Sequence, residues 1–114
     1  MKKIIPLALC AVLLSFCSEE KKLLRKASTA VDQSNFDKAI AYYDQIIHKN
    51  ENSYFGNAGK GIVLSEFMGR HEAAIPYLEK ALSSSPPDKS KPVIHGNLGR
   101  SYHFIGNFKR ALEY

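Results

Sequence analysis

The side chains best suited to chemistry in this sequence are two cysteines and four histidines. Both cysteines, Cys10 and Cys17, fall within the first 17 residues. The histidines stand at positions 48, 71, 95 and 103, and these separations do not match the spacing of metal ligands. The sequence also lacks a glycine-rich phosphate loop, a nucleophile elbow and an HExxH motif. We therefore expect no catalytic residue, no metal and no cofactor, and we do not expect an enzyme.

The segment that holds both cysteines has the form of an export signal. Lys2 and Lys3 give it a positive start, and an apolar run over residues 4–14 follows, interrupted by Pro6 and Cys10. The run is shorter than the roughly 20 residues that a helix needs to cross a bilayer. A cleaved signal peptide therefore explains it better than a membrane span.

The end of this segment, Leu14-Ser15-Phe16-Cys17, resembles the lipobox of bacterial lipoproteins. Leu14, Ser15 and Cys17 match that pattern, whereas Phe16 departs from it because a small residue normally precedes the cysteine. The resemblance implies a signal peptide over residues 1–17 and acyl chains such as palmitate on Cys17, which would anchor the protein to a membrane of the bacterial cell envelope. An ordinary secretory signal, giving a periplasmic or secreted soluble protein, stays the alternative.

Composition limits the remaining residues to one small globular domain. The chain has 114 residues, of which 45% are hydrophobic, so the body can bury a core. Without Lys2 and Lys3, 14 basic residues remain against 11 acidic ones. This excess is too small to indicate nucleic-acid binding. Because both cysteines lie in the signal segment, the body needs no disulfide.

Apolar residues recur at helical spacing throughout the body. One set is Ala39, Ile40, Tyr43, Ile46 and Ile47, and the same offsets return 35 residues later in Ala74, Ile75, Leu78, Ala81 and Leu82. Such offsets place all five side chains on one face of a helix. The pattern predicts helices over residues 20–33, 36–49, 54–68, 71–84 and 92–105, with a short helix after Asn107.

Turn residues separate these helices at regular intervals. Ser34-Asn35, Gly69-Arg70 and Gly106-Asn107 stand between successive helical patterns. Asparagine is a good N-cap, whereas Arg70 is a poor one. Pro86-Pro87 marks a longer break between two hairpins.

These units resemble the tetratricopeptide repeat. The segments that carry the resemblance are residues 35–43, 69–82 with Pro86, and 97–111. It implies an all-α fold, a right-handed superhelical stack of antiparallel helical hairpins with about two and a half repeats at 20–53, 54–88 and 92–114. Phe36, His71 and Phe108 occupy equivalent places, and we interpret His71 as a packing variant.

The second unit departs from the pattern in its first helix. The glycine expected seven residues before Gly69 is displaced to Gly61, and Ile62 takes its place. Gly56 and Gly59 lie in the same helix, and glycine costs about 1 kcal/mol relative to alanine in a helix interior. We expect this helix to be the least stable of the five.

The resemblance also names a candidate ligand groove, lined by the first helix of each hairpin. Its candidate residues are Leu24, Ser28, Lys60, Val63, Phe67, Asn97, Arg100 and His103. One interpretation is a peptide groove in which Arg100 pairs with a carboxylate. The other is that these are ordinary surface and packing positions. The carboxylate clamp of the chaperone-binding members is not matched, since Leu24, Ser28, Val93 and Asn97 stand at its positions.

A basic cluster follows the signal segment directly. Lys21, Lys22, Arg25 and Lys26 could contact acidic lipid head groups, at roughly 1 kcal/mol per charge near an anionic surface. The alternative is a solvated helix face, partly neutralised by Glu19 and Glu20.

The third hairpin extends only a few residues into its second helix. Short helices are marginal in water, so we expect either a fragment of a longer repeat protein or completion by a partner or a second copy; a frayed stub is the alternative. As a function we expect a scaffold or adaptor of the cell envelope that binds a protein or peptide. The alternatives are a membrane-surface structural protein and an accessory domain of an enzyme complex carried on another chain.

Overall fold

The computed structural model describes residues 7–84 and 87–114, with side chains described from Ser18 onward. The described residues form helices and connecting turns without a strand, as the sequence predicts. In chain order the elements are α1 (Leu7–Asp32), α2 (Phe36–Lys49), α3 (Tyr54–Ile62), the π-helix η1 (Val63–Phe67), α4 (His71–Ser83), the 3-10 helix η2 (Asp88–Ser90), α5 (Lys91–Phe104) and α6 (Phe108–Ala111).

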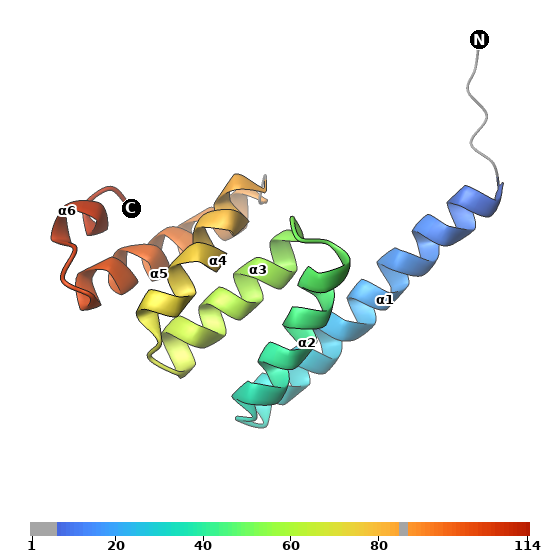
Figure 1. Cartoon of the computed structure of the whole chain (residues 1–114), viewed down its shortest axis with the longest axis horizontal. Coiled ribbons are helices and arrows are strands. Elements are labelled where there is room, and N and C mark those ends of the chain that lie inside the picture. The colour runs from blue at the N-terminus through green and yellow to red at the C-terminus, as the bar shows by residue number, and fades with distance from the viewer. Residues whose placement is uncertain (1–6, 85–86) are drawn as a thin grey trace, which may run out of the picture.

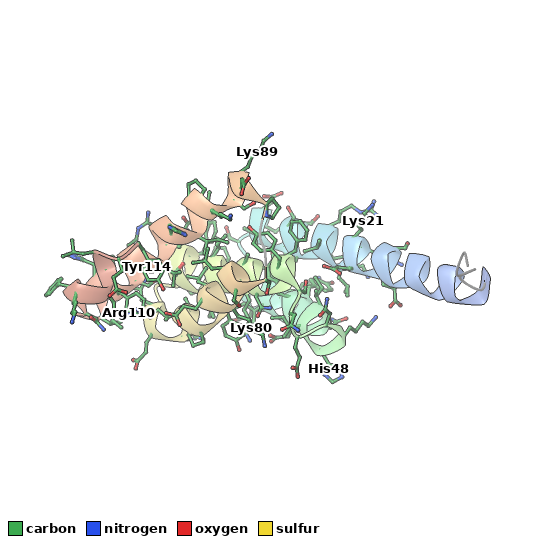
Figure 2. All side chains as sticks on the ribbon, turned by 90° about the horizontal axis from the view of Figure 1, so that it is seen from above. Lys21, His48, Lys80, Lys89, Arg110 and Tyr114 are labelled. Carbon is green, nitrogen blue, oxygen red and sulfur yellow. The ribbon has the colours of Figure 1, made fainter. Side chains whose placement is uncertain are left out.

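The helices pair as antiparallel hairpins that stack side by side (Figure 1). α1 packs on α2, α3 on α4, and α5 on α6, while α2 packs on α3 and α4 on α5. The expected range of α2 agrees with the structure at both ends. α1 instead begins at Leu7, well before the expected start, because residues 7–32 contain neither glycine nor proline to interrupt it. Figure 2 shows this helix running past Lys21 and beyond the body of the molecule.

Three tight turns close the hairpins with the residues that the sequence indicated. Ser34, Gly69 and Gly106 have φ values of 58°, 65° and 83°, the left-handed conformation that ends many helices. The side chain of Asn35 accepts a hydrogen bond from the Lys38 amide, whereas Arg70 makes no side-chain cap. The difference in N-caps predicted from the sequence is therefore confirmed.

The displaced glycine of the second unit is accommodated by the π-helix. In the other hairpins the amides of Asn35 and Asn107 donate to carbonyls five residues earlier, but the amide of Arg70 donates to Leu64, six residues earlier. The extra residue widens one helical turn, which is how single insertions are commonly absorbed. Gly61 therefore keeps its place at the helix crossing although its spacing to Gly69 has changed.

The glycines of α3 lie where neighbouring helices come closest. A Cβ on Gly61 would stand 2.7 Å from Cγ of Leu78, and one on Gly59 would overlap the Tyr43 ring. The same glycines that lower the helix propensity of α3 therefore allow α2 and α4 to pack closely against it.

A continuous core joins the second and third hairpins. Leu78, Ile94 and Leu98 are fully buried at its centre. Small residues also lie within the helix packing, since Ala27, Ala39, Ala74 and Ala81 are all fully buried. α4 remains helical through Pro76. This core fixes α3, α4 and α5 relative to one another.

The short α6 is held by one carboxylate from the preceding hairpin. Glu79 accepts hydrogen bonds from the hydroxyl of Tyr102, from Arg110 at 3.3 Å and from Tyr114 at 3.5 Å. Burial and the bond to Glu79 raise the pKa of Tyr102 above its ordinary value. Arg110 also pairs with Glu113 at 2.5 Å. These bonds give the C-terminal turn more support than a four-residue helix has alone.

Candidate functional site

The predicted groove residues separate into buried and exposed groups. Val63 and Asn97 are only 2% and 3% exposed. Asn97 accepts a hydrogen bond from Ser65 at 2.9 Å and donates to the carbonyl of Val93 at 3.0 Å. The bond from Ser65 to Asn97 joins the second and third hairpins. Both Val63 and Asn97 are buried and offer little surface to a ligand in this structure.

Lys60 is engaged within the chain. Its ammonium group donates to Asp44 at 2.6 Å and to the hydroxyl of Tyr77 at 2.9 Å, and it lies 4.3 Å from the centre of the Tyr77 ring. Burial by itself would lower the pKa of Lys60, but the bonds to Asp44 and Tyr77 outweigh it, so that the pKa is raised. This charged group ties α3 to both neighbouring helices.

Arg100 pairs with a carboxylate of its own chain. Its guanidinium lies 3.7 Å from the carboxylate of Glu66. The Arg100 side chain is 53% exposed and the Glu66 side chain is 35% exposed. Exposed pairs of this length contribute little to stability. A ligand carboxylate could therefore exchange with Glu66 at small cost.

Leu24 and Ser28 lie apart from the other predicted residues. Both belong to α1, whose main packing partner is α2. Leu24 is half-buried and Ser28 is exposed. The remaining two predicted residues, Phe67 and His103, belong to a row of aromatic contacts along the turns.

We call this row the aromatic ladder. In the first two hairpins, the first residue of the second helix faces an aromatic side chain near the end of the next hairpin's first helix. Phe36 stacks with Phe67 at a centroid distance of 5.1 Å, and His71 stacks with Phe104 at 4.4 Å. His71 also lies 3.0 Å from the hydroxyl oxygen of Ser101. The prediction that His71 is a packing variant of Phe36 is confirmed.

The third position of the ladder, Phe108, has a different environment. Its ring meets His103 of its own hairpin edge-on at 5.2 Å, and 59% of the residue is exposed. Beside it, large apolar side chains are exposed on the same hairpin. We call the set Phe104, Ile105, Phe108 and Leu112 the apolar end. An open cleft of about 700 Å³ lies next to Phe104 and Ile105, against the turn that contains Gly69.

The sequence did not single out this apolar end as a surface. Phe108 was interpreted as the equivalent of Phe36 and His71, and its spacing gave no sign of exposure. The rings that face Phe36 and His71, Phe67 and Phe104, each come from the hairpin that follows, and among the described residues no ring stands in that relation to Phe108.

Over residues 18–84 and 87–114, whose side chains are described, His, Cys, Asp and Glu side chains nowhere gather in threes around a possible metal position. In the same part of the chain, no helix combines the length and the apolar character that crossing a bilayer requires.

Comparison with models of protein families gives a match. Residues 60–88 match the family model described as tetratricopeptide repeat. The matched segment includes η1 and α4 and lies within the unit expected over residues 54–88. No curated protein matches the chain. The chain thus contains a tetratricopeptide repeat, a module that is typically non-catalytic, and the repeat supports a role in protein–protein interaction.

Proposed function

We propose that this protein is a scaffold of the cell envelope that binds a partner protein at the apolar end of its hairpin stack. The observation that carries the proposal is the aromatic ladder. Phe36 and His71 each receive a ring from the following hairpin, whereas Phe108 is 59% exposed. The same hairpin geometry can accept one more helix at this place.

The ladder indicates the chemistry of the partner. Phe67 and Phe104 each stand near the end of a helix that packs beside the acceptor ring. The partner segment should therefore be helical and should carry an aromatic side chain near its C-terminal end. Leu112 at 87% exposure and Phe104 at 66% add apolar area that such a helix would bury.

Phe108→Glu tests this proposal. An acidic residue is well tolerated at a helix N-terminus, so α6 should persist while the apolar end gains a charge. We expect capture of the partner from an envelope extract to fall about tenfold or more, since a buried charge without a pair is costly. The matched control is Val93→Glu, which alters another exposed apolar residue, 52% exposed, near the start of α5.

A photo-crosslinking residue at position 112 identifies the surface directly. The expected product joins this chain to the protein that Phe108→Glu fails to capture. Undiminished capture by Phe108→Glu, or crosslinks from position 112 to other copies of the chain alone, would overturn the proposal.

The envelope location rests on the sequence of the signal segment. Cys17 lies outside the described side chains, and residues 1–6 lie outside the described structure. Two acyl chains on Cys17, at about 0.8 kcal/mol per buried CH₂, would hold the protein firmly at a membrane, whereas one chain is marginal. The helical stack would then be displayed at the membrane surface.

Cys17→Ala should release the protein into the soluble fraction, because the acyl attachment is lost. The measurement is membrane fractionation in high salt, which removes electrostatic binding. Cys10→Ala is the matched control and should leave the protein in the membrane, since Cys10 is removed with the signal. If Cys17→Ala remains as membrane-bound as the parent protein, lipid at Cys17 is not the anchor.

A further inference from the structure

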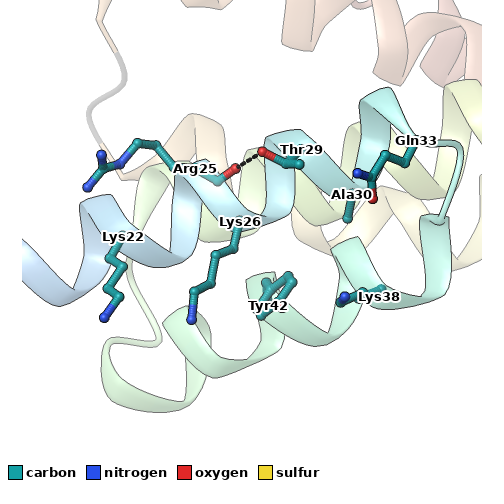
Figure 3. Close-up of a pocket in the computed structure, with 8 residues that line it drawn as sticks. All are labelled: Lys22, Arg25, Lys26, Thr29, Ala30, Gln33, Lys38 and Tyr42. Carbon is teal, nitrogen blue, oxygen red and sulfur yellow. Dashed lines mark hydrogen bonds between the residues drawn. The ribbon is translucent and has the colours of Figure 1, made fainter.

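A basic groove runs between α1 and α2 (Figure 3). It encloses about 470 Å³ and is open to solvent. One wall comes from α1 and the other from the first half of α2. Its lining residues are Lys22, Arg25, Lys26, Thr29, Ala30, Gln33, Lys38 and Tyr42.

The charges of this groove are of one sign. Lys22, Arg25, Lys26 and Lys38 contribute four cations, and no acidic residue is among the lining residues. Within residues 18–84 and 87–114, none of the four forms an ion pair, whereas Lys49 and Lys60 pair with Glu19 and Asp44. Glu19 interacts electrostatically with Lys22 at one end of the groove, whereas the groove itself is lined by cations alone. Neighbouring cations repel one another, and an anionic ligand would relieve that repulsion.

Polar groups and a ring complete the groove. Lys26 reaches over the ring of Tyr42, with its ammonium nitrogen 5.9 Å from the centroid. Figure 3 shows Gln33 and Lys38 near one end and Lys22 near the other. The hydroxyl of Thr29 donates to the carbonyl of Arg25 at 3.0 Å, so its oxygen keeps acceptor capacity and its position is fixed.

We propose that this groove binds an extended acidic segment of a partner protein. From Lys22 to Gln33 the helix rises about 16 Å, which matches about five residues of extended chain. Lys22 and Lys26 are about 6 Å apart along the helix, close to the roughly 6.6 Å between alternate residues of a strand. Acidic side chains at alternate positions would therefore meet Lys22, Lys26 and, on the opposite wall, Lys38.

The length of the groove favours such a segment over a membrane surface. If the protein is attached to a membrane through Cys17, Lys21 and Lys22 lie near the head groups. Gln33 lies about 24 Å from Cys17 along the helix axis. Electrostatic attraction is largely screened beyond about 8–10 Å at physiological salt. With α1 upright on the membrane, head groups would leave Lys38 and the far end of the groove without a ligand.

This inference extends the proposed function, since the ligand is again part of a protein, but it uses a different surface. The basic groove belongs to the first hairpin and the apolar end to the third, at opposite ends of the stack (Figure 1). Variants of one surface therefore leave the other intact.

The test uses the full chain and a fluorescent peptide, Glu-Val-Glu-Val-Glu, followed by anisotropy. We expect saturable binding that weakens as salt rises from low to physiological concentration. Lys26→Glu and Lys38→Glu should each weaken it by about tenfold, because an attraction becomes a repulsion of similar size. Lys21→Glu is the matched control: it lies on α1 outside the lining set and should leave peptide binding unchanged.

Two further ligands separate the competing classes of partner. Vesicles with about a third of anionic lipid test the membrane reading, and a single-stranded oligonucleotide tests a nucleic acid. The proposal is overturned if the peptide fails to bind, if Lys21→Glu weakens its binding as much as Lys26→Glu does, or if only vesicles or the oligonucleotide respond to Lys38→Glu. If the peptide fails to bind but Phe108→Glu still reduces partner capture, this inference is wrong and the proposed function is still supported.

Discussion

Gly61→Ala should lower the free energy of unfolding by about 2 kcal/mol, because overpacking a closed core costs about 1–3 kcal/mol. The new methyl group would stand 2.7 Å from two side-chain atoms of Leu78 and 3.3 Å from its backbone nitrogen. Leu78 is fully buried and cannot move aside. The loss should exceed the gain of about 1 kcal/mol that alanine brings through helix propensity. Thermal or denaturant unfolding measures the difference.

Gly96→Ala is the matched control for this effect. Gly96 lies within α5, and a Cβ built there meets no atom within 4 Å. The substitution should therefore raise stability by about 1 kcal/mol through helix propensity alone. In a Leu78→Ala background, Gly61→Ala should change sign and become stabilising, since the methyl group then fills vacated space. Equal destabilisation by Gly61→Ala in both backgrounds would show that Leu78 is not the cause.

Deletion of Gln45 should abolish cooperative unfolding, whereas deletion of Glu66 should change stability by no more than about 1 kcal/mol. Removing one residue from an α-helix rotates everything beyond it by about 100°. In α2 this would turn Ile46, which is 2% exposed, away from the core. In η1, deletion of Glu66 removes the surplus residue and restores the seven-residue spacing between Gly61 and Gly69.

Circular dichroism with thermal melting measures both deletions. Glu66 is the suitable residue because its side chain contacts solvent and only the weak pair with Arg100 is lost. If deletion of Glu66 also abolishes cooperative unfolding, the surrounding packing requires the wide turn of η1.

Most of the helical framework follows from local sequence. α2 and the turns at Ser34, Gly69 and Gly106 were predicted because apolar periodicity and turn residues act over a few neighbouring positions. The equivalence of Phe36, His71 and Phe108 was also evident from spacing. Local patterns report which residues share a helix face, and in a hairpin repeat that face is the one that packs.

Tertiary structure decided how the remaining side chains are used. The resemblance to the repeat family placed Val63 and Asn97 on the candidate groove, but packing in the folded chain buries both. The basic cluster on α1 was evident from the sequence, yet its groove exists only because α2 supplies Lys38 and Tyr42 as a second wall. The π-helix absorbs a spacing change that the sequence showed only as a displaced glycine. These features depend on contacts between residues far apart in the chain, and such contacts are fixed by how whole helices fit together.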